Sequence, residues 1–117
     1  MAHNITVIKE GKADIELVRG DTLVLTLNLA QNDETFTPEE GDQIIFTVRK
    51  NYKGLTNDAI LLQKTVDLYD SIVLEIEPED TNSLDYGSYK YDMEFDSWDG
   101  KVDTVIQGTF KLAKEVT

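Results

Sequence analysis

The sequence predicts an all-β fold, an antiparallel β-sandwich of about seven to nine strands. Apolar and polar residues alternate with period two along most of the chain, as they do in strands that bury one face. Turn residues separate these alternating segments every few positions, which is the spacing typical of a sandwich. With 117 residues, 40% of them hydrophobic, the chain has the size of one compact domain. We therefore expect a single domain over residues 1–117.

Six strands are expected before the last third of the chain, at residues 4–8, 13–19, 23–29, 43–50, 60–66 and 72–76. The alternation is clearest over 23–29, where four leucines share one face of a single strand. Strand 43–50 is expected at the centre of a sheet. Polar residues predict connections over 31–42 and 51–58. Residues 78–84 predict one short helical turn, because a proline followed by two acids is favoured at a helix start.

The last third of the chain predicts a long β-hairpin. Asp99-Gly100 is a strong signal for a two-residue type I′ turn, because Gly accepts the positive φ that this turn needs. A turn of that length sets the register of the two strands. The inward pairs would be Met93 with Ile106, Tyr91 with Gly108, and Tyr89 with Phe110.

Composition excludes several function classes. The net charge of −12 disfavours binding to nucleic acid and to anionic membrane surfaces. There is no cysteine, and His3 is the single histidine, so no thiolate zinc site, cysteine nucleophile or histidine-based triad is expected. We expect no enzyme activity and no cofactor. The first nine residues lack the basic and apolar regions of a signal peptide, so none is expected.

Exposed aromatic residues are the best candidates for partner contacts. Trp98 lies beside the Asp99-Gly100 turn, and a tryptophan at a loop tip is typical of protein interfaces and sugar-stacking sites. Packing over the hairpin end is the equally weighted alternative. Asp99 belongs to the same tip, and Tyr52 and Tyr69 lie in predicted connections, so all three are further partner-contact candidates.

Acidic residues near the hairpin tip raise the question of a calcium site. The two-residue turn would place Asp96 opposite Asp103, with Asp99 between them, and opposed like charges favour a cation. The spacing matches no calcium loop, so three acids exposed to water are the preferred interpretation. Asp92 and Glu94 are likewise expected on a solvated face, with no burial to shift either pKa.

Two short motifs have both an ordinary and a functional interpretation. Arg19-Gly20-Asp21 spells an integrin-binding tripeptide, but a tight turn is the preferred interpretation. Residues 85–91 resemble the corner motif of immunoglobulin-type domains, in which an acid, a small residue and a tyrosine lead into a core strand. The resemblance implies an immunoglobulin-like sandwich. It also implies that Tyr89 is the corner tyrosine, with a buried ring and a hydroxyl bonded to the backbone upstream.

A longer resemblance covers most of the chain. It rests on the order of five segments: Arg19-Gly20-Asp21-Thr22, Gly41-Asp42, Pro78-Glu79-Asp80-Thr81, Gly87-Ser88-Tyr89-Lys90-Tyr91-Asp92 and Gly108-Thr109-Phe110. This order is similar to small immunoglobulin-like domains of phages and prophages of Gram-positive bacteria, including the amino-terminal domain of phage baseplate upper proteins. Those proteins continue into a long carboxy-terminal region, whereas this sequence ends at Thr117, which suggests a decoration, adaptor or minor tail protein.

The function expected from this resemblance is a structural role in a virion or phage tail, through protein–protein contacts. The expected partners are other virion or tail proteins, and a homo-oligomer is expected. The expected location is the virion, assembled in the bacterial cytoplasm. The alternative is a carbohydrate-binding module, with Trp98 or the loop tyrosines stacking on sugar rings and calcium at the hairpin tip.

Overall fold

The computed structural model describes residues 5–8, 14–31, 34–50 and 60–114. Most of these residues lie in strands, so the all-β class is confirmed. The strands are β1 (Ile5–Ile8), β2 (Ile15–Val18), β3 (Leu23–Thr26), β4 (Asn28–Gln31), β5 (Glu34–Thr35), β6 (Gln43–Lys50), β7 (Ile60–Asp67), β8 (Val73–Ile76), β9 (Gly87–Asp96) and β10 (Val102–Ala113). One helical turn, α1 (Pro78–Thr81), lies between β8 and β9. No helix in these ranges is long and apolar enough to cross a bilayer.

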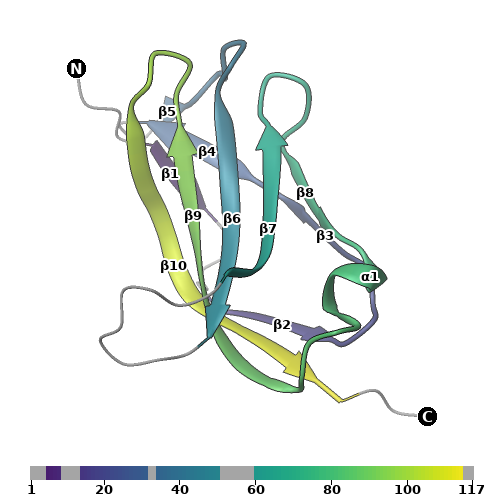
Figure 1. The fold of residues 1–117 in the computed structure, drawn as a ribbon. Helices are drawn as coiled ribbons and strands as arrows, with labels where there is room; N and C mark the ends of the chain where they lie inside the picture. The colour runs from purple at the N-terminus through teal and green to yellow at the C-terminus, as the bar shows by residue number, and fades with distance from the viewer. Residues whose placement is uncertain (1–4, 9–13, 32–33, 51–59, 115–117) are drawn as a thin grey trace.

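The largest sheet has five strands in the order β2-β10-β9-β6-β7. Its neighbours are antiparallel except for β2 and β10, which are parallel. Strand β6 pairs with β9 on one side and β7 on the other, so the predicted inner position of 43–50 is confirmed. The remaining strands form the pair β3-β8 and the sheet β1-β4-β5, and Figure 1 shows β4 running diagonally behind β9 and β6, with β3 and β8 beyond the β7 edge.

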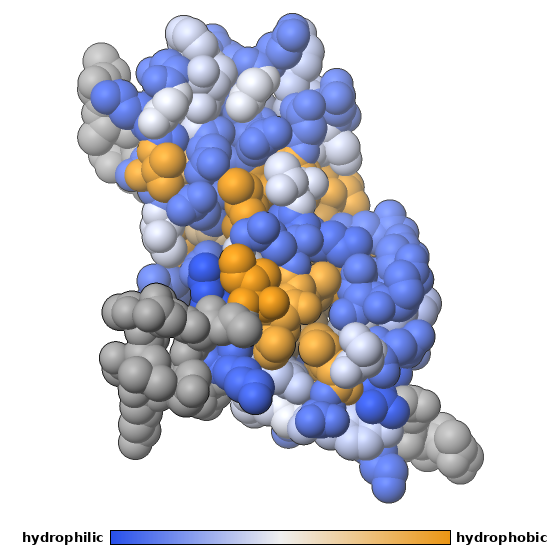
Figure 2. Space-filling view, in the orientation of Figure 1, coloured by the Kyte–Doolittle hydropathy of each residue, from blue (hydrophilic) through white to orange (hydrophobic). Residues whose placement is uncertain are grey.

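The core lies between these two layers. Alternation directs one face of each strand inward, so the five-stranded sheet contributes large buried side chains from β6, β9 and β10. The aromatic rings pack together: the Phe46 ring is 5.4 Å from that of Tyr91 and 5.9 Å from that of Phe110. The opposite layer contributes buried Leu27, Leu29, Leu74 and Ile76. The outer face of the five-stranded sheet is turned toward the viewer, and Figure 2 shows mostly hydrophilic residues with apolar residues near its centre.

The hairpin β9–β10 has the predicted register along most of its length but a different turn. All three predicted inward pairs are present, including Tyr91 opposite Gly108. The loop, however, has three residues: the Ser97 N–H donates to the Lys101 carbonyl at 2.8 Å, and Gly100 has φ +88°. A register shift between Thr104 and Ile106 offsets the extra loop residue, and so restores the predicted pairing below it.

The predicted single strand over 23–29 is wrong. The chain divides at Leu27: β3 pairs with β8, whereas β4 pairs with β1 and β5. Leu27 stays buried at the division, and its N–H donates to the Ile72 carbonyl at 2.7 Å. The leucine alternation therefore continues through a point where the chain passes from one sheet to the other, and no glycine or proline marks that point.

The predicted helical turn is confirmed as α1. Pro78 is at its start, where the missing N–H costs nothing, and Glu79 and Asp80 follow in the first turn. The Asp80 carboxylate accepts the Glu77 N–H at 2.7 Å. The same carboxylate contacts the Lys64 ammonium at 2.7 Å, which holds α1 against strand β7.

Candidate functional site

Three connections meet at one end of the molecule, the upper end in Figure 1. They are residues 36–42 before β6, 68–72 between β7 and β8, and 97–101 between β9 and β10. We call this region the loop end. Because it contains Trp98, Asp99 and Tyr69, the structure gathers three of the predicted partner-contact residues there. The fourth, Tyr52, lies outside the described residues.

Asp42 connects the three loops by hydrogen bonds. Its carboxylate accepts the Trp98 N–H through Oδ1 and the Glu39 N–H through Oδ2, both at 2.9 Å. Its carbonyl oxygen accepts the Leu68 N–H at 3.0 Å. The residue is only 2% exposed, so these charge-assisted bonds form away from solvent. The carboxylate therefore joins its own loop to the hairpin loop, and the Asp42 carbonyl joins it to residues 68–72, which fixes the relative positions of the three connections.

Gly41 allows the hairpin loop to approach Asp42 closely. A Cβ at this position would lie 2.9 Å from Cβ of Trp98, and the backbone has φ +98°, so any other residue would be strained. From the sequence, Gly41-Asp42 was of interest only as part of a resemblance. Its structural role depends on Trp98, which is 56 positions away, and no local pattern reveals such a contact.

Trp98 and Tyr69 are held by their backbones and exposed at their rings. Trp98 is 60% exposed and Tyr69 is 58% exposed. The Tyr69 N–H donates to the Asp67 carboxylate at 3.2 Å. The exposed Asp99 carboxylate accepts the Ser97 hydroxyl, and the Ser97 oxygen accepts the Lys101 N–H. The loop end thus presents two aromatic rings on a backbone stabilised by hydrogen bonds, an arrangement that suits contact with another molecule.

The premise of the calcium site is wrong. The three-residue loop places Asp96 opposite Val102 and Asp103 opposite Phe95, so the two acids are not cross-strand partners. Within the described part of the chain, no three carboxylate or histidine side chains are close enough to share a metal ion. Since calcium needs about six to eight oxygen ligands, the hairpin tip lacks the arrangement that motivated the hypothesis.

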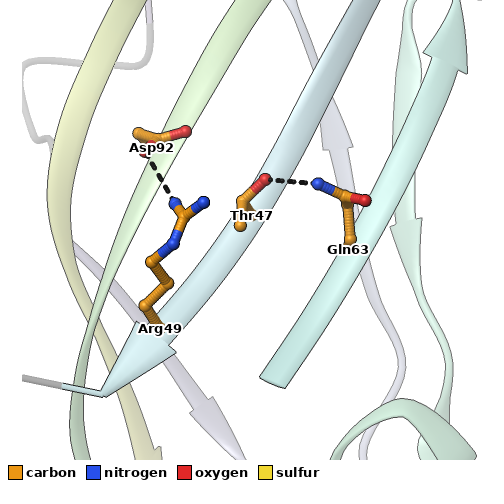
Figure 3. Close-up of polar contacts among 4 residues, drawn as sticks. All are labelled: Thr47, Arg49, Gln63 and Asp92. Carbon is orange, nitrogen blue, oxygen red and sulfur yellow. Dashed lines mark hydrogen bonds and ion pairs between the residues drawn. The ribbon is translucent and has the colours of Figure 1, made fainter. Parts of the chain in front are cut away.

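The outer face of β9 is less solvated than expected. Burial raises the pKa of Asp92, and the Arg49 guanidinium, with Nη1 3.4 Å from the carboxylate, partly opposes that rise (Figure 3). Burial also raises the pKa of Glu94, and a hydrogen bond with Asp96 adds to it. The expectation that neither acid has a shifted pKa is therefore wrong, because neighbouring side chains on this face partly cover the Asp92 carboxyl group and, to a smaller extent, that of Glu94.

The Arg19-Gly20-Asp21 segment forms a turn whose arginine is engaged within the molecule. The guanidinium donates to the Leu84 carbonyl at 3.2 Å and to the Tyr86 hydroxyl at 3.0 Å. It also lies 4.2 Å from the centre of the Tyr86 ring, in a cation–π contact. Gly20 has φ +89°, and its N–H donates to the Thr81 hydroxyl at 3.0 Å. An arginine held in this way is not presented to a receptor.

Comparison with known proteins adds no family assignment. No protein-family model matches the sequence, and no curated protein matches it either.

Proposed function

We propose that the protein is a structural or adaptor component of a phage-like virion or tail, and that it acts through protein–protein contacts at the loop end. The main support for this contact surface is the pair of hydrogen bonds to the Asp42 carboxylate, which hold the loops of Trp98 and Glu39 together. It leaves Trp98 60% exposed on a backbone that is already ordered. Little conformational entropy is then lost when a partner binds, and this favours affinity.

We further propose that the fold is an immunoglobulin-like sandwich. Three observations support it: two layers of strands, a core between them, and the contact of Tyr89. The Tyr89 ring is buried, and its hydroxyl donates to the carbonyl oxygen of Asp85, four residues upstream, at 2.5 Å. This is the geometry implied by the corner-motif resemblance.

The net charge of −12 is consistent with a subunit that stays soluble until it meets its partner. The partner surface would then be apolar at its centre, to take the Trp98 ring, with donors or basic groups around it that pair with exposed acids such as Asp99. A second copy of the chain carries the same acids. Self-assembly would therefore use a two-fold or ring arrangement that keeps these acids apart.

The first test is the solution mass, measured by light scattering after size-exclusion chromatography over a wide concentration range. We expect a closed oligomer with a definite subunit number, unaffected by calcium. Trp98→Ala should lower its association constant by about thirtyfold or more, since a central tryptophan contributes about 2 kcal/mol or more to an interface. Tyr86→Ala, which removes a tyrosine away from the loop end, is the matched control and should leave the mass unchanged.

A strict monomer at every concentration would contradict self-assembly through the loop end. The virion assignment has its own test: the chain should be present at a fixed copy number in purified particles from the strain that encodes it. Its absence from such particles, as judged by mass spectrometry, would contradict the virion role.

A further inference from the structure

A hollow of about 470 Å³ lies on the outer face of the five-stranded sheet, where β6, β9 and β10 run side by side. This volume is within the range of about 300–1,000 Å³ typical of ligand sites. The residues that form it include Thr47, Arg49, Lys90, Asp92, Gln107 and Gly108. The hollow is distinct from the loop end, because Arg49 and Lys90 lie at the opposite ends of β6 and β9 from Asp42 and Trp98.

A row of polar side chains on β6, β9 and β10 crosses the hollow and continues onto the neighbouring strand β7. Asp92 on β9 is the register partner of Gln107 on β10 and of Thr47 on β6, and Thr47 is in turn the partner of Gln63 on β7. The Gln63 amide donates to the Thr47 hydroxyl at 3.1 Å, as Figure 3 shows. Carboxylate, amide and hydroxyl groups side by side offer both donors and acceptors to a ligand rich in hydroxyl groups.

The next pair of residues on the same face of β6 and β9, Arg49 and Lys90, adds positive charge to the hollow. Arg49 is the direct cross-strand partner of Lys90, and like charges in that position repel unless an anion lies between them. Asp92 supplies one negative charge, but its contact with Arg49 is 3.4 Å long, whereas a tight pair of this kind is about 2.7–2.9 Å. Among the described residues that line the hollow, two cations and one carboxylate leave an excess of positive charge, in a protein whose net charge is −12. A ligand carboxylate would neutralise that excess.

We propose that this hollow binds a carboxylated monosaccharide unit, with its carboxylate on Arg49 and Lys90 and its hydroxyl groups on Asp92 and Gln107. The guanidinium presents five N–H donors in a plane and can bind a carboxylate while it remains near Asp92. Burial that raises the pKa of Asp92 also strengthens hydrogen bonds made in the hollow, because water competes less. The inference stands independently of the proposed partner at the loop end.

The test is a titration of ¹⁵N-labelled protein with glucuronate, followed by amide chemical shifts, with glucose and acetate as matched ligands. We expect saturable shifts at amides around the hollow and a Kd for glucuronate about tenfold lower than for either matched ligand. Arg49→Gln and Lys90→Gln should each raise that Kd about tenfold. Lys111→Gln is the control: it removes a positive charge from β10, where Lys111 forms an exposed ion pair with Glu16 on β2. This variant should leave the Kd unchanged.

Each alternative outcome overturns a stated part of the proposal. The absence of saturable shifts would exclude a site for this ligand. Equal affinity for acetate would show that the hollow binds a simple anion, and equal affinity for glucose would remove the role of the two cations. Equal weakening by Lys111→Gln would show general electrostatic attraction. Lys90 is exposed, so its variant should fold even where Arg49→Gln does not.

Discussion

The two ends of the five-stranded sheet use similar hydrogen bonds but expose their aromatic residues differently. At the loop end, buried Asp42 accepts backbone N–H groups from two segments. At the end that carries α1, buried Thr81 accepts the Gly20 N–H. Tyr86 is 42% exposed there, yet its ring and hydroxyl are engaged by Arg19. Trp98 has no ring or cation–π contact with any described residue. An exposed aromatic residue is therefore a good candidate for binding a partner only where its ring is not already bound within the molecule.

The largest effect is expected from removal of the carboxylate that organises the loop end. Asp42→Ala should lower the free energy of unfolding by about 3 kcal/mol, because two buried charge-assisted hydrogen bonds are lost and their N–H donors remain. Urea unfolding followed by circular dichroism measures it. Asp70→Ala, an exposed acid in a neighbouring loop, is the control and should change stability by less than about 0.5 kcal/mol. Similar losses in the two variants would show that Asp42 does not organise this end.

A smaller effect distinguishes the two exposed aromatic residues. Tyr86→Ala should cost about 1 kcal/mol, because it removes the cation–π contact and the hydrogen bond with Arg19. Trp98→Ala should cost less than about 0.5 kcal/mol, since the ring has few internal contacts, although it should weaken assembly. Thermal unfolding of both variants at one protein concentration gives the comparison. The opposite order would mean that the Trp98 ring packs over the hairpin end and is part of the fold.

The smallest effect concerns β9, which carries Asp92, Glu94 and Asp96 on one face between the two ends. Burial and the neighbouring acids raise the pKa of Glu94, so its ionised form is disfavoured in the fold. Wild-type stability should therefore gain from this group as the pH falls through the raised pKa toward about 4.5, and lose that gain as the pH rises. Glu94→Gln should stabilise the protein at neutral pH by about 0.5 kcal/mol at most, because the group is largely exposed to solvent.

The gain from Glu94→Gln should shrink with added salt, which screens the repulsion between the acids. It should also disappear near pH 4, where the wild-type carboxyl is protonated. Stability measured against pH for both proteins gives the two curves. A constant difference at all pH values would assign the effect to packing and would leave the carboxyl charge without a role.

Sequence alone predicted the parts of the fold that depend on local alternation. The period-two pattern over 89–95 identified the inward face of the hairpin, and the predicted inward pairs were correct because the register shift offset the extra loop residue. The turn length was wrong because Asp-Gly is compatible with both two- and three-residue loops. The register shift at Val105 was missed, although Val105 and Ile106 are consecutive apolar residues, both half-buried, and such a pair interrupts the alternation.

Contacts between distant segments could not be predicted in this way. The division at Leu27 leaves the leucine alternation unbroken, so the passage between sheets has no local signal. Trp98 and Tyr69 were each chosen as candidates, but their common location depends on Asp42 and on bonds across many residues. The hollow on the sheet face combines residues from three strands, and only the tertiary structure brings Arg49, Asp92 and Gln107 together.

The position of Trp98 also determines which part of the molecule intrinsic tryptophan fluorescence reports on. It is the only tryptophan in the sequence, and it lies on the surface of the loop end, outside the core. Intrinsic tryptophan fluorescence therefore reports the surroundings of one hairpin loop. It is insensitive to the packing of the core residues Phe46, Tyr91 and Phe110. A partner that covers the indole would shift its emission to shorter wavelength, without any attached dye. An emission change during denaturation would record the release of this loop, which can precede the loss of the core.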